Sequence, residues 1–227
     1  MKKNYFITGF FFVALFLVAA FITGCSKDGD SEDNELGGDT NIPLNQVGNT
    51  FRGGILVNDE FVNAPPYSFE IVASHDGVAT VELIYDLQAV PELAFINDLI
   101  PDELKDDQGR LNCRGDVKMT SEGILDYTNL DGAPFTAVKY DAKVGDKYVL
   151  KKSNGQKITR KVIQRSEEDD FEWGLMLIKV ITVEQDSRIP GIKNIIYKFN
   201  HKFGLVYIEA NAEDGSKFSA YVNPADY

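Results

Sequence analysis

The residue types that carry most protein chemistry are scarce in this sequence. Its 227 residues contain two histidines, His75 and His201, and two cysteines, Cys25 and Cys113. The histidines fall in separate predicted hairpins, so they do not make the spacing of a zinc site. A glycine-rich phosphate loop, a nucleophile elbow and an H-E-x-x-H pattern are also missing from the sequence. We therefore expect no metal, no cofactor and no enzyme activity, although carboxylates that are distant in sequence can meet in a folded chain.

Three short motifs suggest chemistry but lack its context. Gly29-Asp30-Ser31 matches the nucleophile block of a Gly-Asp-Ser esterase, yet it lies in an acidic stretch without a strand before it. The tripeptide at residues 114–116 matches an integrin-binding sequence, which occurs often by chance. The acids from Asp28 onward lack the glycine and glutamate positions of an EF-hand loop. We interpret all three as chance matches.

The first 24 residues have the composition of an export signal. Lys2 and Lys3 form a short basic start, and an unbroken apolar run of twelve residues extends from Phe10 to Phe21. This is the length of a secretory h-region. The alternative is a signal anchor, since Tyr5 to Ile22 is eighteen residues and sits at the lower edge of a membrane span. The residues that follow the run favour the export signal.

A cysteine stands directly behind this run. Ile22, Thr23, Gly24 and Cys25 resemble the bacterial lipobox, where small residues fit the signal-peptidase cleft and the cysteine thiol receives a diacylglycerol. The resemblance implies cleavage before Cys25 and a third acyl chain on the new amine. Stable anchoring needs two membrane signals, and three acyl chains exceed that. We predict a chain that is anchored to a membrane through its acyl chains and does not span it.

An acidic segment follows the cysteine. Residues 26–49 hold six acids and one lysine, a composition that favours a flexible tether. The acidic start led by Ser26 resembles the surface-export signal of Bacteroidetes-type lipoproteins. The aspartate that often marks inner-membrane retention is absent from that position. The resemblance implies an outer-membrane lipoprotein exposed at the cell surface, with a periplasm-facing position as the alternative.

Net charge narrows the range of partners. Removing residues 1–24 takes away two lysines and no acids, which leaves 21 basic and 35 acidic residues and a formal charge of −14. Nucleic-acid binding needs a basic patch that neutralises phosphates, so we expect no nucleic-acid partner. The same charge favours solubility and repels anionic lipid headgroups.

The sequence predicts three parts: a signal peptide over residues 1–24, a lipidated Cys25 with its tether to residue 49, and one globular domain over residues 50–227. The 178 residues of this domain are enough to bury one substantial core. Cys113 is then a single thiol, which excludes a disulfide framework and is typical of a small buried hydrophobe.

Alternating apolar residues and glycine-containing turns predict an antiparallel β domain. Asn154-Gly155 is the strongest turn signal, because both residues accept the positive φ angles of a type I′ hairpin. Asp76-Gly77 and Asp214-Gly215 mark two further hairpins. The predicted strands are 51–57, 67–73, 78–87, 147–152, 157–165, 173–184, 192–200, 205–211 and 218–222.

Residues 91–104 depart from this pattern. Apolar residues at 93, 96, 100 and 104 have helical spacing, and Pro91 suits a helix start. Pro101 interrupts the helix. We predict two short helical pieces that pack on the core, with a plug or lid over one end of a sheet as the alternative.

One pentapeptide pattern occurs twice. Val47-Gly48-Asn49-Thr50-Phe51 and Val144-Gly145-Asp146-Lys147-Tyr148 both precede a predicted strand. The echo suggests two sheet-forming halves, although five positions are too few to establish a repeat.

The C-terminal part resembles a known envelope fold. Residues 144–222 run from "VGDKY" through an Asn-Gly hairpin and "LMLIKVITVE" to "YKFNHKFGLVYIEANAEDG". This order resembles the half-barrel of Lol-type lipoprotein carriers, in which a curved antiparallel sheet wraps an apolar groove and helices cover the opening. The resemblance covers 79 of the 203 mature residues and has no counterpart over residues 51–127. It implies a groove for acyl chains or another apolar ligand.

These observations predict a mainly antiparallel half-barrel or closed barrel with one or two short helices. One expected function is a binding module that holds an apolar or glycan ligand against inward strand positions. We expect that lining to include Phe69, Ile71, Leu177 and Val206. The alternative is a structural or accessory surface protein with a filled core and an exposed apolar patch for a protein partner.

Overall fold

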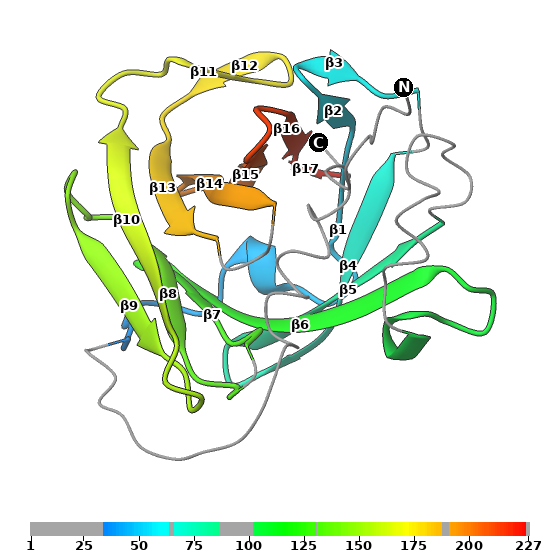
Figure 1. The fold of residues 1–227 in the computed structure, drawn as a ribbon. Coiled ribbons are helices and arrows are strands. Elements are labelled where there is room, and N and C mark those ends of the chain that lie inside the picture. The colour runs from blue at the N-terminus through cyan, green and yellow to red at the C-terminus, as the bar shows by residue number, and fades with distance from the viewer. Residues whose placement is uncertain (1–33, 64–65, 87–101, 130, 188–190, 226–227) are drawn as a thin grey trace.

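The computed structural model describes residues 34–63, 66–86, 102–129, 131–187 and 191–225 (Figure 1). In this part of the chain the fold is mainly antiparallel β-structure, as predicted, with two short 3-10 helices, η1 (Pro43–Asn45) and η2 (Asp102–Leu104). Neither helix has the length and apolarity to cross a membrane. The predicted signal peptide, Cys25 and the helical prediction for residues 91–101 lie outside the described residues.

Strands from the first half of the domain, together with β17 near the C-terminus, form a seven-stranded sheet in the order β17-β1-β4-β5-β6-β7-β8. All neighbouring strands in it are antiparallel. Its strands are β1 (Thr50–Gly53), β4 (Tyr67–His75), β5 (Val78–Tyr85), β6 (Leu111–Thr120), β7 (Gly123–Asp126), β8 (Phe135–Lys139) and β17 (Asn223–Pro224).

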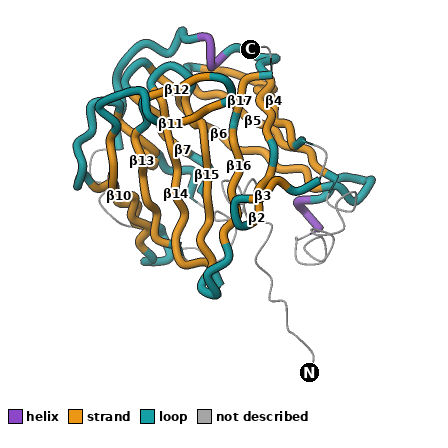
Figure 2. Tube along the Cα trace, turned by 90° about the horizontal axis from the view of Figure 1, so that it is seen from above, coloured by secondary structure: helices purple, strands orange, loops and turns teal. Residues whose placement is uncertain are grey.

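Strands from the second half, together with β2 and β3 from the first half, form an eight-stranded antiparallel sheet in the order β3-β2-β16-β15-β14-β13-β10-β9. Its strands are β2 (Ile55–Val57), β3 (Glu60–Phe61), β9 (Lys147–Lys151), β10 (Lys157–Arg165), β13 (Ile181–Asp186), β14 (Ile192–Asn200), β15 (Gly204–Ala212) and β16 (Lys217–Tyr221). A separate hairpin joins β11 (Phe171–Trp173) to β12 (Met176–Ile178). Figure 2 shows the second sheet from above, with the hairpin near one end of its strands.

The two sheets share one topology. Strands β1, β4, β5, β6, β7 and β8 follow one another through the first sheet, and β9, β10, β13, β14, β15 and β16 follow one another through the second. The twice-occurring pentapeptide opens both meanders. The Gly48 amide donates to the Ile71 carbonyl over 2.8 Å, and the Gly145 amide donates to the Val162 carbonyl over 2.8 Å. The suggestion of two sheet-forming halves is confirmed.

The chain crosses between the sheets at one corner through two glycines. Gly53 ends β1 and Gly54 precedes β2, so the same segment pairs with β4 in one sheet and with β16 in the other. A Cβ atom on Gly53 would lie 1.7 Å from the Tyr221 carbonyl oxygen, so this crossing requires glycine. The predicted single strand over residues 51–57 is therefore two strands. At the opposite corner β8 lies against β9, and the sheets curl around a shared apolar core (Figure 1).

The Asp76-Gly77 turn is confirmed, whereas the Asn154-Gly155 prediction is confirmed only for the pairing of the strands on either side. Asp76 and Gly77 both have positive φ, 50° and 79°, and close a two-residue hairpin between β4 and β5. Strands β9 and β10 pair as predicted, but only Gly155 in their loop has positive φ. The loop spans residues 152–156 because the Lys152 amide donates to the Gln156 carbonyl over 2.8 Å. The type I′ prediction for Asn154-Gly155 is wrong.

The prediction of one long strand over residues 173–184 is also wrong. Gly174, with φ of 59°, turns the chain so that Trp173 pairs with Met176. The Trp173 indole packs against Phe203 at 4.5 Å between ring centroids and donates to the Val222 carbonyl over 3.0 Å. This second apolar cluster lies apart from the main core and holds the β11–β12 hairpin against the second sheet.

The segment expected to be a tether already belongs to the domain from Asn34 onward. Asn34 and Leu36 are buried, and the Asp39 carbonyl accepts a hydrogen bond from the Ser121 amide over 2.9 Å. The buried Asn45 side chain donates to the Met119 carbonyl over 2.7 Å. Residues 34–49 thus pack on the sheets, so the packed part of the chain includes sixteen residues before the expected domain start at residue 50.

Candidate functional site

An apolar cavity of about 120 Å³ lies between the two sheets. The first sheet supplies most of its wall, and the second sheet with its β14–β15 turn closes it. The lining residues are Leu44, Phe51, Tyr67, Phe69, Ile71, Val81, Leu83, Gly115, Val117, Met119, Ile124, Thr128, Phe199, Phe203, Gly204, Leu205, Ile208 and Val222.

Strand alternation positions the wall. Side chains two residues apart on a strand point to the same face, so β6 presents positions 115, 117 and 119 to the interior. Gly115 pairs with Val81 on β5, and both residues belong to the cavity lining. On β4, Phe69 and Ile71 face the same interior. A glycine in the middle of an inward row thus leaves volume that a larger residue would occupy.

The lining is almost entirely hydrocarbon. The Phe51 and Phe69 rings stack at 5.0 Å between centroids. Tyr67 contributes its ring, but its hydroxyl donates to the Tyr221 carbonyl and burial raises its pKa. Thr128 is the remaining hydroxyl in the wall. An apolar wall of this kind favours apolar molecules, of about the size of benzene, over polar ones.

The rim of the cavity is less buried than its floor. Leu44, Val81 and Leu205 are half-buried, whereas Ile71, Leu83 and Ile208 are buried. Leu44 comes from η1, which Asn45 fixes to β6 through its bond to the Met119 carbonyl. The packed N-terminal segment therefore forms part of the rim.

The structure brings two of the four predicted lining residues together. Phe69 and Ile71 both line the cavity. Val206 is fully buried, but it lies in the second apolar cluster with Trp173 and not in the cavity wall. Leu177 is 60% exposed on β12, because the turn at Gly174 carries it to the outside. Val206 therefore points inward as expected and Leu177 does not, and neither residue belongs to the wall of this cavity.

The sequence analysis missed the contribution of β6. Leu111, Cys113, Gly115, Val117 and Met119 alternate with polar residues, a clear signal of a strand with one buried face. The tripeptide at residues 114–116, which matches an integrin-binding sequence, lies within this alternating stretch. In the structure Arg114 pairs with Glu82 at 2.6 Å and Asp116 accepts from Thr80 over 2.7 Å, both from within the sheet.

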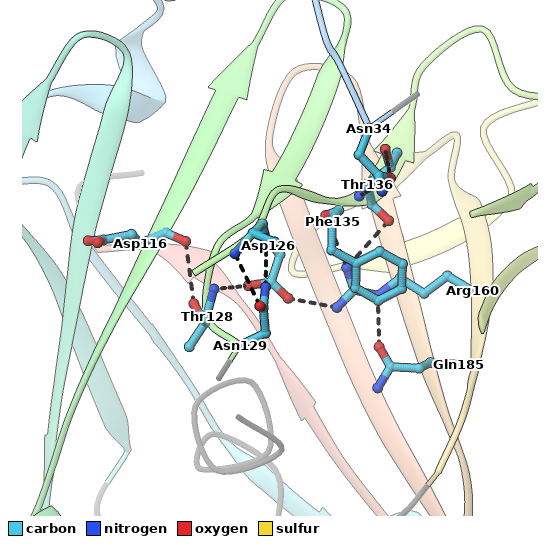
Figure 3. Close-up of polar contacts among 10 residues, drawn as sticks. Asn34, Asp116, Asp126, Thr128, Asn129, Phe135, Thr136, Arg160 and Gln185 are labelled. Atoms are coloured by element: carbon cyan, nitrogen blue, oxygen red, sulfur yellow. Dashed lines mark hydrogen bonds and ion pairs between the residues drawn. The ribbon is translucent and has the colours of Figure 1, made fainter. Parts of the chain in front are cut away.

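A polar network occupies the part of the interior next to Thr128 of the cavity wall, whose amide donates to the Asp126 side chain over 2.7 Å (Figure 3). The Arg160 guanidinium on β10 pairs with Asp126 on β7 at 2.7 Å, and the side chains are 4% and 6% exposed. The same guanidinium donates to the Gln185 side chain over 2.7 Å and lies 4.0 Å from the centre of the Phe135 ring. These contacts join β7 and β8 of the first sheet to β10 and β13 of the second.

Asn34 links the two sheets where β8 lies against β9, a contact that we call the β8–β9 seam. Its side-chain oxygen accepts from the Thr136 amide over 3.1 Å and from the Thr136 hydroxyl over 3.0 Å. Its amide nitrogen donates to the Val149 carbonyl on β9 over 3.5 Å. The Thr136 carbonyl in turn accepts from Arg160 over 3.3 Å (Figure 3).

The residues with reactive side chains do not converge on the cavity. His75 lies in the β4–β5 turn, 92% exposed beside Asp76, and His201 is exposed in the β14–β15 turn. Cys113 is buried in the core, and burial raises the pKa of its thiol to about 12. Within the described ranges no group of three or more His, Cys, Asp and Glu gathers as a metal site.

No family model matches the chain, and no curated protein matches it. A solved structure of similar outline is that of a Bacteroides fragilis protein, predicted to be exported, with a YmcC-like fold. The two chains are 9% identical, and the match covers 78% of this chain and 95% of that chain with a TM-score of 0.45. A likeness at this level does not carry a location or a function over to this chain.

Proposed function

We propose that this protein is a lipid-anchored lipoprotein of the cell envelope that holds an apolar ligand between its two sheets. The observation that carries the proposal is the apolar cavity of about 120 Å³, whose floor is formed by buried side chains such as Ile71 and Ile208. Its volume matches a short hydrocarbon segment, such as part of an acyl chain. In this proposal the protein binds its ligand and does not convert it.

The chemistry of the wall favours hydrocarbon over a glycan. A sugar presents hydroxyl groups that lose their bonds to water on burial, and each needs a new partner. The Thr128 hydroxyl already donates to the Asp116 carbonyl over 3.3 Å, and the Tyr67 hydroxyl already donates to the Tyr221 carbonyl, so neither can donate to a sugar without losing that bond. Of the two ligand classes expected from the sequence, the apolar class is the one we propose.

The binding proposal is tested by native mass spectrometry of residues 26–227, purified without the acyl anchor. We expect an added mass that disappears on organic extraction and returns on incubation with a fatty acid. Gly115→Leu places a side chain into the cavity and should abolish the adduct. Lys118→Leu, on the other face of the same strand, is the matched control and should retain it. A wild-type chain without any adduct, before or after incubation, would contradict the proposal.

The anchoring proposal rests on the lipobox-like residues before Cys25 and is tested separately. Cells that express the full chain are labelled with an alkyne fatty acid, and the protein is then recovered and analysed by mass. We expect label on the wild type and none on Cys25→Ser, which should accumulate with residues 1–24 still attached. Protease treatment of intact cells then distinguishes a surface position from a periplasm-facing one. Equal labelling of both proteins would contradict the anchor.

A second candidate function is an accessory surface protein that contacts a protein partner. The observation that favours it is the β11–β12 hairpin, where Leu175 is fully exposed and Met176 and Leu177 are 44% and 60% exposed. Three adjacent apolar side chains at a hairpin tip are typical of a contact surface. A partner that crosslinks to the wild type but not to Leu175→Ser, with an empty cavity in both, would favour this function.

A further inference from the structure

Basic residues concentrate in one part of this acidic protein. The whole chain has a formal charge of −12, yet residues 139–165 contain nine basic and two acidic residues. Arg160 is buried and paired with Asp126. Six of the other eight basic residues lie on β9, on β10 or in the loop between them, at the edge of the second sheet, whereas Lys139 ends β8 and Lys143 lies between β8 and β9.

Strand pairing places four of these lysines in two like-charged pairs. Lys147 on β9 is directly opposite Lys161 on β10, and Lys151 is directly opposite Lys157. These positions alternate with the buried Tyr148 and Leu150, so the four lysines share the outer face of the hairpin. Like charges directly opposite each other destabilise a sheet unless another charge compensates them.

The neighbouring acids compensate this face only in part. Glu184 on β13 lies opposite Lys161, and its carboxylate also accepts a bond from Asn194. Asp131 accepts two hydrogen bonds from Ser153 in the β9–β10 loop. The ion pairs found among the described residues do not include Lys147, Lys151 or Lys161.

The anchored end of the chain enters the domain at this same edge. Asn34 donates to the Val149 carbonyl, and Val149 lies between Lys147 and Lys151 on β9. Nine residue steps separate Cys25 from Asn34, which span at most about 30 Å when fully extended. A domain of this length is about 40 Å across, so the acyl chains cannot reach its far side.

We propose that the basic outer face of the β9–β10 hairpin binds the anionic headgroups of the membrane in which the protein is anchored. The proposal rests on the lipid anchor proposed above. A basic face next to a lipid anchor adds electrostatic attraction to the phosphates of anionic lipids. Such contact orients the β8–β9 seam towards the bilayer. The acidic net charge of the chain predicts repulsion from anionic lipids. In this proposal that repulsion applies to the other faces of the molecule and not to the β9–β10 face.

Lysine footprinting on vesicles tests this orientation. Residues 25–227 are coupled through Cys25 to a maleimide lipid, and the buried Cys113 thiol, whose pKa is raised to about 12, does not compete. One set of vesicles is phosphatidylcholine and the other contains about 30% phosphatidylglycerol. An amine-reactive reagent is applied, and mass spectrometry gives a rate for each lysine. Because the lipid is installed chemically, a failure here is distinct from a failure of acylation in cells.

We expect Lys147, Lys151, Lys157 and Lys161 to react about fivefold more slowly on the anionic vesicles, and about 0.5 M salt to remove the difference. The comparison set is Lys118, Lys179, Lys193 and Lys202, whose rates should not change. Replacing the first four by Gln should also remove the protection of Lys143. Replacing the comparison set by Gln should leave it in place.

Four outcomes would overturn the proposal. Equal rates on both kinds of vesicle would exclude attraction to anionic lipid, and protection of the comparison set would place another face on the membrane. Protection of the four lysines by inorganic phosphate alone would indicate a site for a free anion. Protection already present in the uncoupled chain, and lost when Asp28, Asp30, Glu32 and Asp33 are replaced by Asn or Gln, would show that the acidic segment of this chain covers the face.

Discussion

The interior between the two sheets has an apolar end, which contains a cavity, and a polar end, which contains a buried ion pair. At one end the sheets meet around an apolar space beside Gly115, and the wall contains hardly any polar atom. At the other end Arg160 and Asp126 fill the space with a buried ion pair, and Gln185 and Asn34 satisfy the polar groups around it. Both ends lie between the same two sheets.

From this difference we infer which end stabilises the fold and which end the proposed ligand would occupy. The Arg160 network joins four strands from both sheets and fixes their distance at the β8–β9 seam. Removal of Arg160 would leave the Asp126 carboxylate buried without a compensating charge. The lining of the cavity contains no charged side chain, so a substitution there leaves no buried charge without its partner. The predictions that follow test this division from the largest expected effect to the smallest.

Arg160→Ala should produce the largest loss of stability, about 3–5 kcal/mol, because it leaves the Asp126 carboxylate buried without its partner. Urea unfolding measured by tryptophan fluorescence gives the value. The double variant Arg160→Met with Asp126→Leu should recover most of the loss, since neither residue then buries a charge. If the single variant unfolds like the wild type, the polar end does not hold the sheets together.

Asn34→Ala should cost about 1–2 kcal/mol, because the buried Thr136 amide and hydroxyl lose their acceptor. The same urea titration measures the change. Asn41→Ala, in the exposed part of the same segment, is the control and should have no effect beyond the error. A loss at Asn41 as large as that at Asn34 would mean that the segment contributes through its backbone and not through the seam.

Gly115→Leu should change stability by less than about 1 kcal/mol, because the new side chain enters space that is already present. Its effect should instead be on ligand uptake, which the native mass spectrum measures. This result would distinguish the roles of the two ends, since Gly115→Leu would change ligand binding but not stability, whereas Arg160→Ala would change stability. A destabilisation as large as that of Arg160→Ala would show that the cavity end is as tightly packed as the polar end.

Leu175→Ser should have the smallest effect on folding, below about 0.5 kcal/mol, because the side chain is fully exposed at the hairpin tip. Thermal unfolding measures it. Trp173→Ala in the same hairpin is the contrasting variant and should cost about 3 kcal/mol or more, since the indole is buried against Phe203. Equal effects would place the tip in the packed part of the structure.

The antiparallel β class, most hairpins and the division into two halves could be predicted from local signals. Alternation along residues 192–200 and 205–211 and the turn at Asp76-Gly77 are properties of a few neighbouring residues, and the structure contains them. The prediction of one strand over residues 173–184 failed because the neighbouring apolar residues do not reveal that the chain turns at Gly174. The apolar cluster with Phe203, which holds that turn, lies about thirty residues further along the chain.

The sequence by itself determined the strand alternation, the acidic net charge and the cysteine behind an apolar run. These are readable because each depends on residue type and short-range spacing. Only the tertiary structure decided that Phe69 and Ile71 share a cavity while Val206 and Leu177 do not, and that Asn34 closes the seam. Those placements depend on which strands meet across the interior, and on bulges and turns that change the face to which a side chain points.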